Sequence, residues 1–198
     1  MKIIIGALLS VLSITSALAE TVLITGTNRG IGLEFVKQYA ERGATIIATA
    51  RRPSEAKELL ALAAQHPKVT IEALDVTDVA AIEALALKYR GKPIDILINN
   101  AGTLGDVPKQ SIGSLDQAEF LYVINANTYG ALKMAEAFKP NLAASTQKKV
   151  FGMSSGLGSS AMVTRRGGFY AYRASKAALN IVFRSLAADW RDQGIIVG

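Results

Sequence analysis

The sequence predicts an α/β fold: a doubly wound parallel sheet with helices on both faces, so that the domain has three layers. Apolar, β-rich runs alternate along the chain with segments of helical period, which is the pattern of a parallel sheet with right-handed crossovers. A glycine-rich turn joins the first strand to the first helix. The 198 residues are 50% hydrophobic, which is enough for one buried core. We expect strands near 21–26, 44–50, 69–74, 94–99 and 149–155.

The turn after the first strand reads Thr25-Gly26-Thr27-Asn28-Arg29-Gly30-Ile31-Gly32. The run before it is apolar, and the apolar positions after it repeat with helical period. Such a junction offers free backbone N–H groups and the positive end of a helix dipole to a pyrophosphate, and glycines let the ligand approach the backbone. An ordinary strand-to-helix turn is the simpler alternative, but the flanking elements are those that a dinucleotide site needs. We predict cofactor contacts from Gly26, Asn28, Arg29, Gly30, Ile31 and Gly32.

The second strand ends in Arg51-Arg52-Pro53. A nucleotide fold that prefers NAD usually places an acidic residue near this point, where it binds the ribose 2′-hydroxyl. Here no carboxylate occurs before Glu55, and guanidinium groups pair well with phosphate. The sequence therefore predicts NADP(H) as cofactor, with Arg51 at the 2′-phosphate and Arg29 within reach of it. The alternative is that the two arginines form a solvated loop.

The alternation continues through the middle of the chain. A helical stretch at 54–62 starts with a capping-type serine, and a second one at 78–87 is rich in alanine. Leu74-Asp75-Val76 follows the third strand, and Asn99-Asn100-Ala101-Gly102 follows the fourth. We find no internal repeat, linker or low-complexity tract, so the sequence indicates a single domain from 20 to 198.

Tyr172 and Lys176 form a Tyr-x-x-x-Lys pair after the fifth strand. Positions four apart lie on one face of a helix, so both side chains can point at one ligand. A phenol holds its proton until about pH 10, but a nearby cation stabilises the phenolate and makes such a group usable in acid–base catalysis. Tyr170 lies six residues before the lysine and so off its face. The spacing is common by chance, and its weight comes from the glycine turn that precedes it.

Together, the glycine turn, Asn99-Asn100-Ala101-Gly102 and Tyr172-x-x-x-Lys176 resemble the short-chain dehydrogenase/reductase family, over a length from about Thr21 to the last residue. The segments 29–34 and 170–180 are most similar to the sniffer-type, NADPH-dependent carbonyl reductases. The resemblance implies a Rossmann-type fold in which Asp75 contacts the adenine. It also implies cofactor contacts from Asn99, Ala101, Gly102, Tyr172 and Lys176.

The family's catalytic set is Asn, Ser, Tyr and Lys. By this resemblance Tyr172 and Lys176 are the last two. The family pattern places the asparagine three residues before a glycine, which selects Asn127 over Asn125. The serine is usually the second of a Ser-Ser pair that ends the fifth strand, which gives Ser155. Ser159 matches the family's commonest separation from the tyrosine and stays an alternative.

These roles imply an oxidoreductase that transfers a hydride between NADP(H) and a ketone or aldehyde, or a secondary alcohol in reverse. Tyr172 would donate the proton, Ser155 would bind the same oxygen, and Lys176 would support the tyrosine and hold the nicotinamide ribose. Asn127 would link the site to a water chain. The alternative is a non-catalytic NADP-binding protein or an inactive remnant. Family members often pair through helices, so a homo-oligomer is possible.

Other functional classes fit less well. Gly152-Met153-Ser154-Ser155-Gly156 is formally a Gly-x-Ser-x-Gly nucleophile elbow, but the only histidine, His66, lies upstream, whereas a hydrolase needs one after the serine. The absence of cysteine excludes thiol catalysis and Cys-based zinc sites, and we predict no metal. The net charge of +6 is scattered rather than massed on one element, which argues against a nucleic-acid partner.

The two ends of the sequence carry separate expectations. Residues 1–19 combine one lysine, an apolar run and a terminal Ala17-Leu18-Ala19, a signal-peptide pattern with cleavage before Glu20. This predicts export, without a membrane span in the mature chain; a cytoplasmic location is the alternative, since reduced nicotinamide cofactor is expected inside the cell. At the other end, 195–198 reads as a sixth strand that stops as it starts. Because family members continue beyond that strand, we expect a truncated substrate side.

Overall fold

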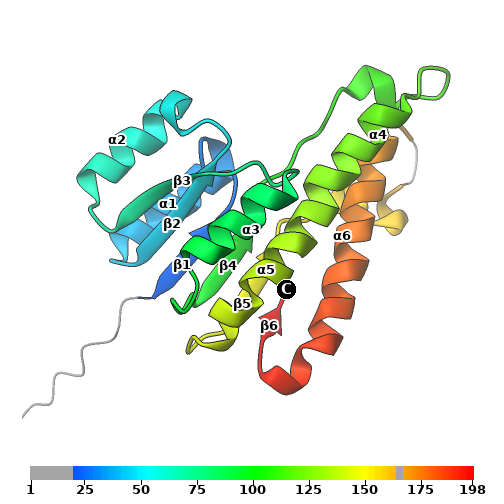
Figure 1. Cartoon of the computed structure of the whole chain (residues 1–198). Helices are drawn as coiled ribbons and strands as arrows, with labels where there is room; N and C mark the ends of the chain where they lie inside the picture. Colours follow the sequence, from blue (N-terminus) through cyan, green and yellow to red (C-terminus); the bar gives the residue numbers. More distant parts are fainter. Residues whose placement is uncertain (1–19, 164–166) are drawn as a thin grey trace, which may run out of the picture.

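Six parallel strands form one sheet in the computed structural model, which describes residues 20–163 and 167–198 (Figure 1). The strand order within this part of the chain is β3-β2-β1-β4-β5-β6. The bounds are β1 Thr21–Ile24, β2 Thr45–Ala50, β3 Val69–Ala73, β4 Ile96–Asn99, β5 Lys149–Gly152 and β6 Ile196–Val197. The predicted doubly wound parallel sheet is confirmed. The predicted signal segment 1–19 lies outside the described residues.

Six longer helices accompany the strands in the described ranges. They are α1 Gly30–Glu41, α2 Lys57–Gln65, α3 Val79–Lys88, α4 Gln117–Ile124, α5 Gly130–Ala143 and α6 Tyr170–Asp189. Short helical turns lie at η1 Pro53–Glu55, η2 Val107–Gln110, η4 Gly156–Gly158, η5 Ser160–Met162 and η6 Arg191–Gln193. Between 20 and 163 and between 167 and 198, no helix combines the length and apolar character that a bilayer span requires.

The side-chain alternation of the strands divides the core into two layers. Leu23 of β1 is in register with Ile47 of β2 and Leu97 of β4, and all three pack on the face covered by α3, α5 and α6. Their neighbours along the strands face α1 and α2 instead. Since successive strand residues point to opposite faces, a sheet buried on both sides reads as continuous apolar runs.

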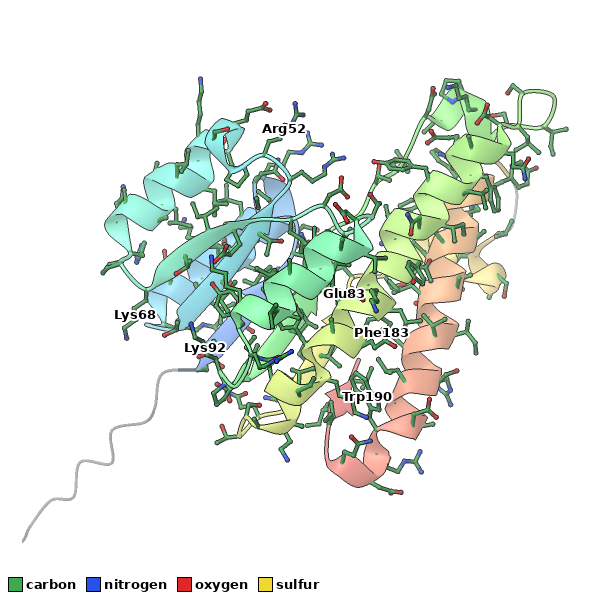
Figure 2. The ribbon with its side chains drawn as sticks, viewed as in Figure 1. Arg52, Lys68, Glu83, Lys92, Phe183 and Trp190 are labelled. Atoms are coloured by element: carbon green, nitrogen blue, oxygen red, sulfur yellow. The ribbon has the colours of Figure 1, made fainter. Side chains whose placement is uncertain are left out.

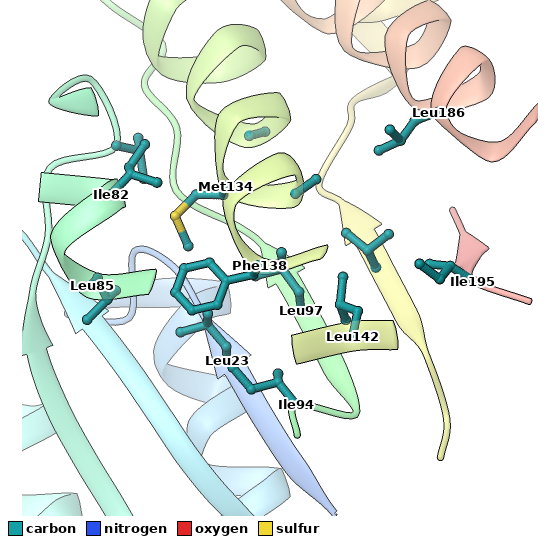
Figure 3. Close-up of a cluster of buried hydrophobic side chains, with 14 of the residues drawn as sticks. Leu23, Ile82, Leu85, Ile94, Leu97, Met134, Phe138, Leu142, Leu186 and Ile195 are labelled. Atoms are coloured by element: carbon teal, nitrogen blue, oxygen red, sulfur yellow. The ribbon is translucent and has the colours of Figure 1, made fainter. Parts of the chain in front are cut away.

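The larger core layer centres on Phe138 of α5, which is fully buried (Figure 3). Figure 3 shows its ring above Leu23 and Leu97 of the sheet, with Met134 one turn away on the same helix. On the far side of this layer, Phe183 of α6 points toward the sheet (Figure 2). A Cβ built on Gly152 of β5 would lie 2.9 Å from the Phe183 ring, so this glycine lets α6 approach the strand closely.

A π-helical segment, η3 Asn125–Tyr129, joins α4 to α5. Such single-turn irregularities insert extra residues into a helix and often occur at functional positions. Here it precedes Gly130, where a Cβ would lie 2.5 Å from the Val76 carbonyl oxygen. The close approach fixes the start of α5 against the segment that follows β3, and it buries Asn127 within the irregular turn.

Candidate active site

A groove of about 490 Å³ opens at the carboxyl ends of β1, β2, β3 and β4. The strand order reverses between β1 and β4, and open α/β sheets bind ligands at that point. Most of the predicted cofactor residues line the groove; they are Gly26, Asn28, Arg29, Gly30, Ile31, Gly32, Arg51, Asp75, Ala101 and Gly102. The predicted contacts Asn99, Tyr172 and Lys176 are not part of its wall.

Two glycines of the turn have no room for a side chain. Gly26 has a φ of +70°, and a Cβ on it would lie 2.7 Å from the Ala101 Cα. A Cβ on Gly32 would overlap the Gly26 carbonyl oxygen and the Asn100 side chain. The glycines therefore bring the start of α1, with its free N–H groups, directly to the groove.

Asn100, which the sequence interpretation did not select, holds the glycine turn in place. Its Nδ2 donates to the carbonyl oxygens of Thr25 and Gly26, both at 2.9 Å. Asn99 is 4% exposed, and neither polar atom of its amide has a hydrogen-bond partner among the described residues. This role of Asn100 has no local signal in the sequence, because its two acceptors lie 74 and 75 residues earlier in the chain.

Arg51 reaches across the groove to α4. Its Nη1 donates to the Tyr122 hydroxyl at 3.3 Å, and both residues line the groove. Arg52 instead pairs with Glu55 at 3.2 Å, and its side chain is 73% exposed (Figure 2). No local pattern points to Tyr122, because its place at the groove depends on a contact with Arg51, 71 residues earlier in the chain. Both arginines line the groove, and Arg52 differs from Arg51 in that its guanidinium is paired with a carboxylate.

Asp75 is fixed at the end of the groove by its own turn. Its Oδ1 accepts hydrogen bonds from the Thr77 backbone N–H at 2.9 Å and from the Thr77 hydroxyl at 2.7 Å. Both residues line the groove together with Leu74 and Val76. An aspartate that bonds its own backbone two residues on is a typical turn former. The segment therefore presents a rigid edge to the ligand.

Asn127 is 1% exposed, and its amide joins two parts of the fold. Its Oδ1 accepts from the Thr103 N–H at 2.7 Å, while its Nδ2 donates to the Thr103 carbonyl at 2.8 Å and to the Ser175 hydroxyl at 2.9 Å. A Cβ on Gly102 would lie 2.9 Å from the Asn127 Oδ1. The loop after β4 is thereby attached to η3 and to α6. Asn125, the rejected alternative, is less buried.

Lys176 lies behind Gly102 at the inner end of the groove. A Cβ on Gly102 would be 3.6 Å from the Lys176 Nζ, and that Nζ lies 5.7 Å from the centre of the Tyr172 ring. The ammonium donates to the Met153 carbonyl at 2.7 Å. Lys176 is 5% exposed, and burial lowers its pKa below the ordinary value of a lysine. The helical spacing of Tyr172 and Lys176 thus brings the two side chains together as the sequence predicted.

Ser155 follows β5 in a segment that contacts Lys176 at both ends. Met153 accepts the lysine's hydrogen bond, and a Cβ on Gly158 would lie 2.8 Å from the Lys176 carbonyl carbon. The Ser155 Oγ accepts from the Leu157 N–H at 3.2 Å and caps η4. Ser159 lies beyond Gly158, between η4 and η5, where its N–H bonds the Gly156 carbonyl at 3.1 Å.

The comparisons with known proteins agree with this architecture. A family model described as "short chain dehydrogenase" matches residues 20–198. Over 181 residues the chain is 33% identical to the galactitol 2-dehydrogenase of Rhizobium johnstonii. The aligned region covers 90% of this chain and 68% of that protein. The NADPH-bound carbonyl reductase from chicken fatty liver has 34% identity and a TM-score of 0.81, covering 89% of this chain and 76% of its own. The Sniffer carbonyl reductase of D. melanogaster has 31% identity and a TM-score of 0.80, and the match covers 91% of this chain and 79% of the reductase.

Proposed function

Because this chain belongs to the short-chain dehydrogenase family, we propose that it is an NADP(H)-dependent oxidoreductase that interconverts a ketone or aldehyde and its alcohol. One observation carries the proposal: Lys176 lies 5.7 Å from the Tyr172 ring, and its ammonium comes close to Gly102, a residue of the groove wall. Asn127 adjoins the same glycine as Lys176.

The groove residues fit the cofactor on chemical grounds. At Gly26 and Gly32 a Cβ would collide with the loop after β4 and with the turn itself, so the glycines keep the turn compact and hold the start of α1, whose N–H groups suit a pyrophosphate, at the groove. Arg51 offers a guanidinium to a 2′-phosphate at the end of β2, and in the sequence no carboxylate follows it before Glu55. Support for NADP(H) over NAD(H) also comes from the similar chicken reductase, whose structure contains NADPH.

The bound nicotinamide would supply or accept the hydride. In the direction of reduction, the Tyr172 phenol donates a proton to the oxygen that becomes the alcohol. Ser155 hydrogen-bonds that oxygen and stabilises its developing charge. Ser155 is favoured over Ser159 because its segment is fixed to Lys176 at both ends.

Lys176 acts on Tyr172 as a nearby positive charge. Its buried ammonium lies 5.7 Å from the ring centre, where a positive charge would stabilise the negative charge that develops during proton transfer. Its hydrogen bond to Met153 fixes where that charge sits. Asn127, whose amide is fully engaged, holds Thr103 and Ser175 and so orders the wall between the groove and the tyrosine helix.

Titration of the purified protein with NADPH and, separately, NADH, followed by cofactor oxidation against a panel of ketones and aldehydes, tests the proposal. We expect tighter binding of NADPH and turnover with at least one carbonyl compound. Binding without turnover would favour the alternative of a non-catalytic NADP-binding protein. A folded sample that binds neither cofactor would contradict the proposal altogether.

We further propose that residues 1–19 act as an export signal. The support is their composition alone, an apolar run that ends in Ala17-Leu18-Ala19. N-terminal sequencing of the protein isolated from its natural source should give Glu20 as the first residue. A mature chain that still begins at Met1 would favour the cytoplasmic alternative.

A further inference from the structure

Gln110 is a buried amide outside the groove that touches the backbone of Tyr172. It is the last residue of η2 and is 1% exposed. Its Oε1 accepts a hydrogen bond from the Tyr172 N–H at 3.0 Å, and its Nε2 donates to the Leu104 carbonyl at 2.7 Å. The side chain, which lies 62 residues before Tyr172 in the chain, therefore connects the tyrosine helix to the loop after β4.

The Tyr172 N–H needs an acceptor from elsewhere in the fold. It lies in the first turn of α6, where backbone N–H groups have no partner within the helix. The residue before the helix, Phe169, makes no side-chain capping bond and has a left-handed backbone with φ of 52°. A capping side chain usually serves the second or third N–H of a helix, and Gln110 serves the third from a distant segment.

Gln110 completes a closed ring of hydrogen bonds around the Tyr172 backbone. The Tyr172 carbonyl accepts from the Ser175 hydroxyl at 2.8 Å, and that hydroxyl accepts from Asn127 at 2.9 Å. Asn127 holds Thr103, while Gln110 holds Leu104, the next residue along the chain. The N–H of Tyr172 is thus linked through Gln110, and its carbonyl through Ser175 and Asn127, to neighbouring residues of one loop. That loop continues from Ala101 and Gly102 of the groove wall.

We propose that Gln110 is a positioning residue, which sets the place of the Tyr172 phenol relative to the inner end of the groove. The inference rests on the proposed function, in which Tyr172 is the proton donor. At this position the side chain has to accept and donate at the same time. A carboxamide does both, and so does a protonated carboxylic acid, whereas an ionised carboxylate can only accept. Since small displacements of a reacting group are costly, the loss of either bond should lower kcat by about 10- to 100-fold.

The chemistry of the amide suggests a pair of variants. Gln110→Leu removes both bonds at every pH, so its kcat should stay low throughout. Gln110→Glu keeps the shape, but its ionised form repels the Leu104 carbonyl while its protonated form restores both bonds. Burial favours the protonated form, and so does the nearby Glu119 carboxylate, since a Cβ on Gly105 would touch both the Glu119 Oε1 and the Gln110 Nε2. The kcat of Gln110→Glu relative to the parent should therefore recover as the pH falls from 8 to 5, and the Kd for NADPH should be nearly unchanged in both variants.

Asn141 provides a matched control. It is another buried amide, 4% exposed, and its Nδ2 donates to the carbonyls of Tyr89 at 2.7 Å and Lys92 at 2.8 Å. Asn141→Asp should lower the melting temperature without a pH-dependent loss of kcat. If Gln110→Glu and Gln110→Leu lose no more kcat than Asn141→Asp, or if the glutamate variant shows no recovery at low pH, Gln110 does not position the tyrosine.

Hydrogen exchange gives a readout that needs no turnover. In Gln110→Leu the Tyr172 amide should exchange at least about tenfold faster than in the parent, because the Gln110 acceptor is gone. Asn141→Asp should leave that amide protected. Unchanged protection in a folded Gln110→Leu overturns the inference whether or not the parent is active. A parent that binds NADPH but turns nothing over would instead refute the proposed function, and the exchange result would still decide whether Gln110 holds the Tyr172 backbone.

Discussion

Lys176 and Met153 are joined by a 2.7 Å hydrogen bond from a buried ammonium to a backbone carbonyl. The carbonyl belongs to the residue that follows β5, so the bond connects the middle of α6 to the carboxyl end of the sheet. Its acceptor is neutral, and burial therefore lowers the lysine's pKa. Burial of the charged Lys176 near Tyr172 therefore lowers the free energy of unfolding.

This cost predicts a pH-dependent effect of Lys176→Met. Below the lowered native pKa, the lysine is charged in both states and carries the whole penalty of burial. Between that pKa and the unfolded value of about 10.4, the unfolded state binds more protons than the native state, so the parent gains stability as the pH rises. The stability of the variant relative to the parent should thus be most favourable near pH 7 and decline toward pH 10. Urea unfolding at the two pH values measures this.

Lys37→Met, at an exposed position of α1, controls for the loss of a lysine as such. A stability difference between Lys176→Met and the parent that does not change with pH would show that burial does not perturb the lysine.

Tyr172→Phe should lower kcat for carbonyl reduction by at least about 100-fold, because the proton donor is removed. The ring and its packing remain, so the Kd for NADPH should be nearly unchanged. Tyr170→Phe is the matched control, since that tyrosine lies two residues earlier and is 39% exposed. Steady-state kinetics beside NADPH titration separate the two effects. Equal turnover by Tyr172→Phe and the parent would exclude Tyr172 as the donor.

Arg51→Ala should weaken NADPH much more than NADH, because only NADPH carries the 2′-phosphate. A hydrogen bond to a charged group contributes about 1.5–3 kcal/mol, which corresponds to a roughly 10- to 100-fold rise in Kd. Arg52→Ala should have a smaller effect, since that arginine is already paired with Glu55. Fluorescence titration with both cofactors decides the point, and a similar loss for NADPH and NADH would argue against a phosphate contact.

Glu72→Gln should destabilise the fold at neutral pH by about 2 kcal/mol, the scale of hydrogen bonds to a charged group. Glu72 of β3 accepts from Lys88 at 2.7 Å and from the Tyr89 hydroxyl at 2.6 Å. Burial alone would raise the pKa of Glu72, but these hydrogen bonds outweigh it and leave the pKa below the ordinary value. The contribution is therefore complete above the unfolded pKa of about 4.3 and is lost as the pH falls through the native one.

Thermal unfolding of Glu72→Gln and of the parent between pH 7 and pH 3 measures this. The difference between their melting temperatures should shrink as the pH falls. Glu55→Gln is the control, because the exposed Arg52–Glu55 pair should contribute less than about 1 kcal/mol. If both variants behave alike, the Glu72 network is no stronger than a surface ion pair.

Local patterns in the sequence were sufficient to predict the fold and the glycine turn. Leu23, Ile47 and Leu97 lie in apolar runs whose length and β-branched composition indicate buried parallel strands. The turn at Gly26 and Gly32 is short, and every constraint on it lies within a few residues. The predicted strands extended too far at 25–26 and 153–155, because Thr25 and Gly26 already belong to the glycine turn and 153–155 belong to the segment that leads into η4.

The remaining site residues depend on contacts between distant segments. Tyr122 of α4 meets Arg51, which follows β2, across the groove, and Gln110 of η2 meets Tyr172 in the first turn of α6. Neither arrangement has a local pattern. The resemblance implied Asn99 as a cofactor contact. The role of Asn100 was missed because the carbonyls that it bonds lie 74 and 75 residues earlier in the chain.

The strand order also bears on how this protein is made. β1 lies at the middle of the sheet, and its partner β4 starts at Ile96, long after β2 and β3 have left the ribosome. The β1-β2-β3 half can therefore assemble first, and the β4-β5-β6 half joins it through contacts of high sequence separation, which form slowly. The groove has walls from both halves, so it exists only after they have joined. A ligand of the groove would thus recognise, and by mass action protect, only chains that have finished folding.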